Sequence, residues 1–343
     1  MKIAMVSTFP PQACGVGEFA ERLCAGYEAL GHQVARFAET GLSGNEAPSN
    51  AMGHFNRHML DPIQLATQIN DFNPDLIEFQ HEFGIWPDST KFEELMLRCN
   101  APIFVTLHTV KRIGHQGFKR ALVASARRTF VQSQAMQCAW PFTTVLRHPT
   151  PVLQGHNTIA AFNVPTFVTP GFISRGKALD VTLRALARVT YPFRWIVAGQ
   201  ADREFLVDLQ TEVQRLGMMD SVRIVPEYLD HAGRSALIDA ASLIILNSQP
   251  TLRPIDTPLS ISGAARDAIA MRKPTASPTL PIYDDLTPEI GAKFPPADDA
   301  VLAEILESKF WGDSAWHGAA SQVFDRLGAW SYGDAAAFRL NYL

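Results

Sequence analysis

The sequence predicts an α/β protein built from two Rossmann-like domains. Its 343 residues exceed the length of about 250 to 300 residues at which a single hydrophobic core stops growing. In both halves, short runs rich in Val, Ile and Phe alternate with segments of helical period, which is typical of βαβ units with a parallel sheet. Residues 149–165 contain prolines, Asn and Gly and have no sustained periodicity, which indicates a domain boundary.

The first half reads as strands and helices in strict alternation, because apolar runs alternate with residues recurring at three- and four-residue spacing. The expected strands span residues 2–8, 33–38, 75–80, 102–107, 129–133 and 143–146, and the expected helices span 17–30, 61–72, 89–98 and 117–127. No apolar run approaches the ~20 residues of a membrane-spanning helix, and residues 1–11 lack a signal-peptide cleavage site. We therefore expect a soluble, cytoplasmic protein.

The second half repeats this architecture. Its expected strands span residues 166–171, 194–199, 222–226, 243–247 and 274–277, its expected helices span 176–189, 203–216, 231–240 and 260–271, and three further helices follow at 298–310, 313–328 and 331–343. The predicted domains are residues 1–155 and 165–330. Four scattered cysteines show neither zinc-site nor disulfide spacing, so no metal site is expected: Cys14, Cys24, Cys99 and Cys138.

Ligands of open parallel sheets bind beyond the carboxyl ends of the strands, so the residues that follow each strand are the candidates. After the first strand comes "PPQACGVGEFAERL", with Gly15, Gly17 and Glu18. A dinucleotide fingerprint would need a third glycine where Ala20 stands and would begin at the strand rather than after a Pro-Pro turn. This loop therefore disfavours a dinucleotide site and a dehydrogenase.

Two histidines follow adjacent strands of the first half. His81 and Glu82 stand in "QHEFGIW", and His108 stands in "TLHTVKR" with Lys111 and Arg112. A histidine at a strand end can bind a phosphate or a sugar hydroxyl, and its ordinary pKa lies near neutrality. The alternative for either one alone is a structural core histidine.

The second half offers two helix starts suited to an anion. The stretch "GFISRGKALDVTLRAL" puts Gly171, Ser174, Arg175 and Lys177 between a strand and a helix, and Lys177 could help the backbone N–H groups neutralise a diphosphate. The alternative is a solvated turn with a helix cap. Another helix start lies near residues 260–263, with the candidates Ser260, Ser262 and Gly263.

These motifs together resemble the family 4 glycosyltransferases of the GT-B fold, in the family's order and over nearly the whole chain. The matching segments are "PPQACGVGEFAERLCAGYEALGHQV", "DLIEFQHEFGIW", "VTLHT", "TPGFISRGKALDVTLRAL", "AGQ", "VRIVPEYL" and the loop before "AIAMRKPTAS". The resemblance implies two Rossmann-like domains facing across a cleft, with the final helix 331–343 crossing back to the first domain. It also implies a retaining, metal-independent hexosyltransferase that needs no cofactor and uses a UDP- or GDP-linked sugar.

The resemblance also implies roles for single residues. Lys177 would hold the donor diphosphate, the Ser262–Gly263 helix start its distal phosphate, and His108 would lie near the reacting sugar. The glycine loop would approach donor and acceptor, and the stretch around Glu227 and Tyr228 would recognise the base. The remaining implied contacts are Gly171, Ser174, Arg175 and Ser260 for the donor, and Glu18, His81, Glu82, Lys111 and Arg112 on the acceptor side.

The sequence departs from the family pattern at two places. The family often has an arginine where Phe172 stands, a position that Arg175 or Arg253 would have to replace. Its Glu-x7-Glu pattern is absent, since Leu259 and Asp267 occupy those positions. Two other functions therefore stay open: a nucleotide-sugar epimerase of similar fold, and a catalytically silent binding protein.

Between Glu94 and Asp180 the chain has ten basic residues and no acidic one. Such a surface would attract a polyanionic acceptor, such as a lipid-linked saccharide, a polysaccharide or a nucleic acid, or the anionic inner face of a membrane, where the protein would be peripheral. The alternative is that the 13 acidic residues of positions 1–94 neutralise it.

Overall fold

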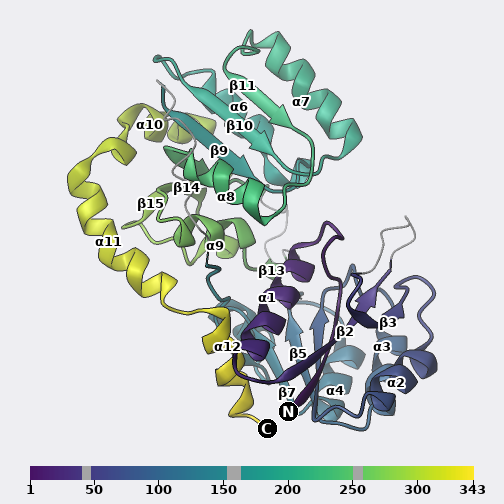
Figure 1. Ribbon diagram of the computed structural model, residues 1–343. Coiled ribbons are helices and arrows are strands. Elements are labelled where there is room, and N and C mark those ends of the chain that lie inside the picture. Colours follow the sequence, from purple (N-terminus) through teal and green to yellow (C-terminus); the bar gives the residue numbers. More distant parts are fainter. Residues whose placement is uncertain (41–47, 153–163, 250–257) are drawn as a thin grey trace. The chain divides into compact units, whose positions relative to one another are not determined.

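A computed structural model describes residues 1–40, 48–152, 164–249 and 258–343 (Figure 1). The chain divides into two compact units. Unit 1 comprises Met1–Pro149, Ile255–Ile261 and Trp330–Leu343, and unit 2 comprises Thr150–Pro254 and Ser262–Ala329. The first unit thus ends at Pro149 rather than near residue 155, and the C-terminal segment groups with it.

Within its described residues, unit 1 contains a seven-stranded sheet in the order β3-β2-β1-β4-β5-β7-β8 with parallel neighbours. Up to β7 this is the Rossmann order, which places the topological switch point between β1 and β4. The strands are β1 (Lys2–Ser7), β2 (Gln33–Glu39), β3 (Ala51–Phe55), β4 (Leu76–His81), β5 (Ile103–Leu107), β7 (Arg128–Val131) and β8 (Thr144–Val145).

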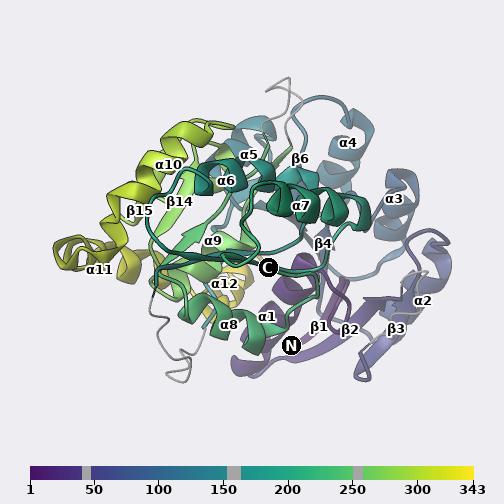
Figure 2. The ribbon, with the colours of Figure 1, turned by 90° about the horizontal axis from the view of Figure 1, so that it is seen from above.

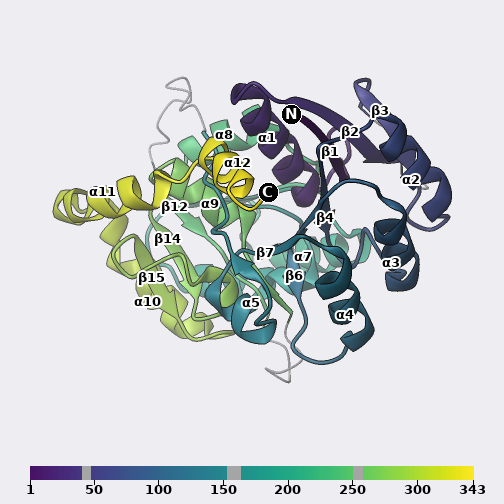
Figure 3. The ribbon, with the colours of Figure 1, turned by 90° about the horizontal axis from the view of Figure 1, so that it is seen from below.

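Helices cover both faces of this sheet (Figure 3). One face packs against α2 (Pro62–Asp71), α3 (Ser89–Arg98), α4 (Gln116–Ser125) and α5 (Gln134–Ala139), and the other against α1 (Gly15–Ala29) and α12 (Tyr332–Leu340). Both faces are apolar because the strands are buried on both sides, as in parallel sheets generally. Helix α12, the last of the chain, is therefore part of the first unit's core.

Unit 2 has a six-stranded parallel sheet in its described residues, ordered β11-β10-β9-β12-β14-β15. The strands are β9 (Thr166–Pro170), β10 (Arg194–Ala198), β11 (Val222–Val225), β12 (Leu243–Ile245), β14 (Thr275–Pro278) and β15 (Gly291–Phe294). The order is again that of a Rossmann fold, with the switch point between β9 and β12. The architecture therefore occurs twice, as the sequence predicts.

Two helical layers also enclose the second sheet (Figure 2). One layer contains α6 (Leu179–Leu186), α7 (Arg203–Arg215) and α10 (Asp299–Ser308), and the other α8 (His231–Asp239), α9 (Gly263–Ala270) and α11 (Ser314–Gly328). Each layer contributes its own apolar cluster, so the core of unit 2 lies on both sides of the strands.

Side-chain caps explain where most of the helices begin. Aspartates accept hydrogen bonds from the first-turn N–H groups of α2, α3, α7, α8, α10 and α11. Ser331 and Asp334 form a capping box at α12. By contrast, α1, α4 and α6 have no capping side chain. Their first N–H groups are left for other partners.

Helices α1 and α12 pack unusually closely. A Cβ added at Gly26 of α1 would come within 2.7 Å of the carbonyl oxygen of Tyr332, the first residue of α12. Only a residue without a side chain permits this approach, so Gly26 fixes the distance between the two helices.

The structure corrects the sequence prediction around residue 260. We expected a helix from 260, but β13 (Leu259–Ser260) pairs antiparallel with β6 (Thr109–Val110), and α9 begins only at Gly263. Leu259 is buried in the core of unit 1, and Ser262 caps α9, so this segment serves unit 1 as a strand before the chain continues in unit 2. The short elements β3, α5 and β15 were not expected either.

Candidate functional site

The carboxyl edge of unit 2 has a loop that leaves open space at its switch point. Gly171 follows β9 with a φ of 115°, and a Cβ there would meet nothing within 4 Å. Gly199 follows β10 with a φ of 151°, and a Cβ there would lie 2.1 Å from the carbonyl oxygen of Gly171. Both positions therefore require glycine, and the first faces a space that a ligand can enter.

Lys177 stands at the end of this loop, and no described residue supplies a counter-charge to it. Its side chain is half-buried, and no hydrogen bond or ion pair joins its ammonium to any described residue. Burial alone lowers its pKa below the ordinary value. The next residue, Ala178, has a φ of 45° and begins α6 without a side-chain cap. A buried ammonium beside an uncapped helix start is a site suited to an anion.

Arg175 lies in an exposed ion pair. Its guanidinium pairs with Asp208 on α7 and lies over the ring of Phe205, with two-thirds of its side chain exposed. Ser174 precedes a 3-10 turn, Arg175–Lys177, and its hydroxyl does not cap it. The guanidinium of Arg175 is therefore directed toward α7. Arg253, the other candidate to replace the family arginine, lies outside the described residues.

A second helix start of unit 2 follows β13. The hydroxyl of Ser262 accepts from the N–H of Ala265, which caps α9, and a Cβ added at Gly263 would meet nothing within 4 Å. Asp267 lies buried one turn further on, 2.8 Å from the guanidinium of Arg234. Ser260 is a correction: it lies in β13 opposite Thr109, and not at the helix start, because the β13 pairing ends before the helix begins.

The stretch after β11, which the resemblance assigns to base recognition, is exposed. Glu227 and Tyr228 are exposed, so both side chains are accessible at the carboxyl end of a strand next to β10. Their placement allows contact with a ligand at this edge.

At the matching place in unit 1, helix α1 begins earlier than expected. Gly15 and Gly17 lie in its first turn rather than in a loop, because the uncapped helix starts at Gly15. A Cβ at Gly17 would stand 3.2 Å from the backbone of Thr8, so the helix start packs on the end of β1. Glu18 pairs with Arg22 at 3.6 Å, one turn along the same helix.

His108 lies between β5 and β6, at the carboxyl edge of unit 1. Its Nε2 lies 2.9 Å from Oε1 of Gln80, and its Nδ1 lies 3.5 Å from Nε2 of Gln132. The ring of Phe19 meets it edge-on at 4.7 Å. Burial and then the charge of Arg339 lower the pKa of His108 to about 3. At neutral pH this side chain is therefore an uncharged imidazole. The residue is 9% exposed, so a small part of it is accessible.

His81 is more deeply enclosed. Its ring stacks on Phe118 at 4.5 Å and meets Phe83 and Phe92 edge-on, and neither ring nitrogen has a hydrogen-bond partner in the described part of the chain. Burial lowers its pKa to about 3. The carboxylate of neighbouring Glu82 accepts from the N–H of Phe83 and shapes the turn after β4. As placed, His81 has no exposed face for an acceptor.

Sequence reasoning passed over two polar side chains of β4. Glu78 and Gln80 are fully buried on one face of that strand, and Glu78 contacts Arg339 of α12 at 2.9 Å. The segment "LIEFQH" could have pointed to them. Polar residues that alternate within an otherwise apolar central strand are buried and must form hydrogen bonds or ion pairs inside the protein.

A basic face lies at the carboxyl edge of unit 1, around the start of α4. We define it by Lys111, Arg112, Lys119 and Arg120. Lys111 lies over the ring of Phe83, and Lys119 over the ring of Trp140. Among the described residues, none of these four side chains forms an ion pair. Most of the ion pairs made by acidic residues of positions 1–94 involve arginines outside the basic face: Arg22, Arg36, Arg57 and Arg339. Of the basic residues in the acid-free segment of unit 1, Arg98 alone has an ion-pair partner in the described part of the chain, namely Glu94.

Apolar side chains accompany this basic face. Val123, Phe142 and Ile113 are exposed, and an open pocket of about 420 Å³ is lined by Lys119, Arg120, Val123, Trp140 and Phe142 among others. The face therefore combines unpaired positive charge with accessible apolar surface.

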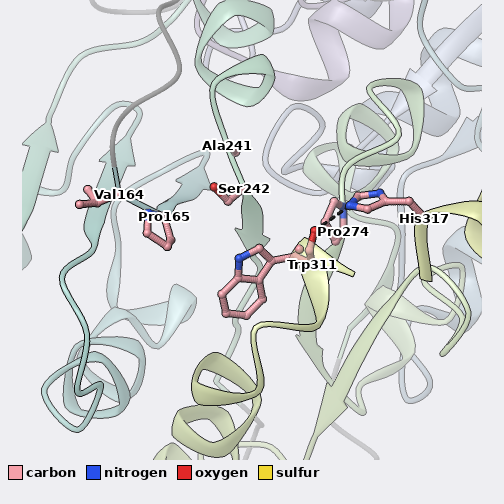
Figure 4. A pocket seen from close by; sticks show the side chains of 8 residues that line it. Val164, Pro165, Ala241, Ser242, Pro274, Trp311 and His317 are labelled. Atoms are coloured by element: carbon pink, nitrogen blue, oxygen red, sulfur yellow. Dashed lines mark hydrogen bonds between the residues drawn. The ribbon is translucent and has the colours of Figure 1, made fainter. Parts of the chain in front are cut away.

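One pocket of unit 2, drawn in Figure 4, is lined by none of the candidate residues. It has a volume of about 440 Å³ and includes Pro165, Ser242 and Pro274, which precede β9, β12 and β14. It is therefore at the amino ends of the strands, opposite to the edge where parallel sheets bind ligands. His317 on its wall is held by the carbonyl oxygen of Trp311 at 2.6 Å.

The described residues contain no cluster of three or more potential metal ligands. None of their helices is long and apolar enough to span a membrane.

Comparisons with known proteins bear on the fold. No protein-family model and no curated protein sequence matches the chain. Solved structures do match: a glycosyltransferase of Rickettsia africae is 16% identical with a TM-score of 0.77, over 99% of this chain and 98% of that one. HepE of Anabaena, in complex with UDP and glucose, is 15% identical with a TM-score of 0.77 over all of both chains.

A third match is AviGT4, a glycosyltransferase involved in avilamycin A biosynthesis, at 17% identity and a TM-score of 0.65, over 100% of this chain and 96% of that one. With the two sheets described above, these similarities show that the chain has the GT-B fold of two Rossmann-like domains.

Proposed function

We propose that the protein is a glycosyltransferase that moves a sugar from a nucleotide-diphosphate sugar to an acceptor, with retention of configuration and without an essential metal. The observation that carries the proposal is Lys177, a half-buried ammonium without a counter-charge in the described residues, beside the uncapped start of α6. A diphosphate would supply the missing charge. The similarity to HepE, which was solved with UDP and with UDP-glucose, supports a uridine nucleotide as the first donor to test.

The chemistry would be stabilisation of the leaving group. Negative charge grows on the departing diphosphate as the anomeric bond breaks, so an ammonium fixed at that point stabilises the transition state more than the ground state. Gly171 would allow the phosphates to approach the backbone, and the N–H groups at the starts of α6 and α9 would bind their oxygens. No proton transfer to the leaving group is required.

In unit 1, His108 would contact the reacting sugar. It is uncharged at neutral pH, so it would orient a hydroxyl group rather than serve as a cation. The acceptor would approach the same edge, next to the start of α1 with Gly15 and Gly17 and to the basic face.

We further propose that the acceptor, or the surface that carries it, is anionic. The four cations of the basic face have no ion-pair partner among the described residues, and exposed Val123 and Phe142 lie beside them. This combination suits an anionic membrane surface with a lipid-linked acceptor. Anionic headgroups would pair with the basic side chains, and acyl chains would contact the apolar side chains. A nucleic acid would use the charges alone.

A ligand panel tests the donor. UDP, GDP and ADP, free and as sugar conjugates, are added in a thermal-shift experiment, in which a ligand at 100 times its dissociation constant adds about 2.7 kcal/mol of stability. The proposal expects one nucleotide to stabilise the wild type and not Lys177→Ala. If none of the nucleotides stabilises the wild type, the proposed donor site is refuted.

Turnover separates the alternatives. An epimerase would convert the nucleotide sugar without an acceptor, whereas a transferase would only hydrolyse it slowly or leave it unchanged. A silent binding protein would bind the nucleotide and turn over nothing with any acceptor. The anomer of the product, read by NMR, tests retention, and undiminished turnover in EDTA tests metal independence.

A further inference from the structure

From a buried chain of contacts, we infer that Gln80, Glu78 and Arg339 are positioning residues for His108: they fix its ring proton on Nε2 and leave Nδ1 as a hydrogen-bond acceptor. The chain runs from α12 through β4 to the end of β5, entirely within unit 1. The part of the inference that concerns a sugar hydroxyl rests on the proposed function, whereas the proton position does not.

The chain begins at a carboxylate that is surrounded by donors. Glu78 is fully buried, and its oxygens lie 2.9 Å from Nε of Arg339, 2.7 Å from the hydroxyl of Tyr27 and 3.4 Å from the hydroxyl of Thr106. The guanidinium also donates to Thr106 and lies over the ring of Phe130. The guanidinium and both hydroxyls present donors to this carboxylate, whose oxygens accept from them.

This fixes the direction of the Gln80 amide. Its nitrogen lies 3.4 Å from Oε1 of Glu78 and 3.3 Å from the sulfur of Met5, and both are acceptors. Turning the amide over would place its oxygen against the carboxylate, which is repulsive and leaves a buried N–H group without its acceptor. Gln80 Oε1 must therefore point at His108.

The direction of the amide in turn fixes the proton on the ring. Gln80 Oε1 can only accept, so Nε2 of His108, at 2.9 Å, must be the donor. In the neutral ring the other nitrogen, Nδ1, then carries the lone pair. Its neighbour Gln132 lies at 3.5 Å, beyond a good hydrogen bond, and follows β7 at the same edge of the sheet. Nδ1 is the atom that can accept a hydrogen bond from a sugar hydroxyl.

The test reads the ring directly. We would label the histidines with ¹⁵N, assign His108 by its loss in His108→Gln, and determine by NMR which ring nitrogen bears the proton, in the protein without donor. The wild type should carry it on Nε2 alone. Gln80→Met removes the acceptor at similar volume, so the proton should distribute over both nitrogens. The value of kcat/KM should fall by about 10- to 100-fold, the size of effect known for the partners that orient metal-bound histidines.

Thr106→Val is the matched control. It removes a hydroxyl that contacts Glu78 and Arg339 but not His108, so it should lower stability and leave the proton on Nε2. A wild-type ring protonated on Nδ1, or an unchanged ring in Gln80→Met, would overturn the inference. The wild-type spectrum decides even if a variant does not fold. An Nε2 proton in a protein that binds no nucleotide sugar would instead refute only the proposed function.

Discussion

At the scale of single residues, burial sets the charge state of three ionisable side chains: Lys177, His108 and His81. Lys177 has a lowered pKa because it is buried, and nothing described compensates its charge. His108 and His81 are kept neutral by burial. Burying these ionisable side chains costs free energy, and for Lys177 and His108, which lie at the carboxyl edges of the sheets, a ligand or a reaction would account for that cost.

The Lys177→Ala variant tests the role of the ammonium. Removing a group that stabilises the leaving group should lower kcat by about a hundred- to a thousandfold, which is about 2.7 to 4 kcal/mol. Lys309→Ala removes the same charge from unit 2 at a lysine that lies over Tyr191, ahead of the amino end of β10, and should leave kcat unchanged. Near-parental turnover of Lys177→Ala would disprove the assignment.

The two buried histidines predict an acid-sensitive fold. Each histidine has a pKa near 6.5 in the unfolded chain and about 3 in the folded protein, so between these pH values the native state binds fewer protons than the unfolded state. The free energy of unfolding is therefore highest above pH 6.5 and decreases as the pH falls towards 3. Between pH 7.5 and 5.0 each should contribute a loss of about 2 kcal/mol.

His81→Phe isolates one of these contributions. Its ring stacks on Phe118 within an aromatic cluster that can hold a phenyl ring, so the variant should fold. Urea unfolding at both pH values should show a loss smaller by about 2 kcal/mol than in the wild type. An equal loss in both proteins would show that His81 is already accessible to protons.

At the scale of elements, the capped and uncapped helices divide by position. Aspartate or serine side chains cap most helix starts. By contrast, α1 and α6, which follow the first strand of each sheet at the switch points, have no side-chain cap, and neither does α4. An open start exposes N–H groups to a ligand. The uncapped starts of α1 and α6 therefore lie at the carboxyl edges of the two sheets, as His108 and Lys177 do.

The basic face around α4 gives a testable surface. Lys119→Glu/Arg120→Glu should abolish binding to vesicles that contain anionic lipid, because each basic residue near such a surface contributes about 1 kcal/mol. Binding should also weaken with salt. The control is Arg203→Glu/Arg223→Glu, which makes the same charge change at residues of unit 2 that have no ion pair among those described. Wild-type protein that ignores vesicles at low salt but binds DNA would favour a nucleic acid.

The contact between α1 and α12 predicts a strong steric effect. Gly26→Val should lower the free energy of unfolding by about 1 to 3 kcal/mol, because the side chain would press on the backbone of Tyr332. Gly318→Val in α11, where a Cβ would meet nothing within 4 Å, is the matched control and should cost well under that amount. Equal urea midpoints for the two variants would contradict the packing argument.

At the scale of the whole molecule, the sequence predicts those features that depend on residues close together in the chain, such as the strands, the helices and their caps. The repeated strand-helix alternation and aspartates such as Asp61 and Asp202 set the elements and their limits, and Lys177 is recognisable from its motif. The β13–β6 pairing and the contact of Glu78 with Arg339 were not predictable, because they join residues far apart in the chain that carry no local signal. For the same reason Ser260 and Arg175 were assigned to the donor on motif position alone.

The buried pair of Glu78 and Arg339 makes a prediction about the whole of unit 1. Arg339→Met leaves the carboxylate without its counter-charge and should cost about 3 to 5 kcal/mol. Glu78→Gln/Arg339→Met removes both charges and should regain most of this loss in urea unfolding. A single variant as stable as the wild type would show that the pair contributes little.

The return of α12 to unit 1 also affects how the protein is made. Glu78 emerges from the ribosome long before Arg339, with all of unit 2 synthesised between them. Until the last helix appears, the nascent first unit has a carboxylate that burial would penalise and an uncovered apolar face at α1. The N-terminal unit is translated first, but its native core can therefore be completed only after α12 has been synthesised.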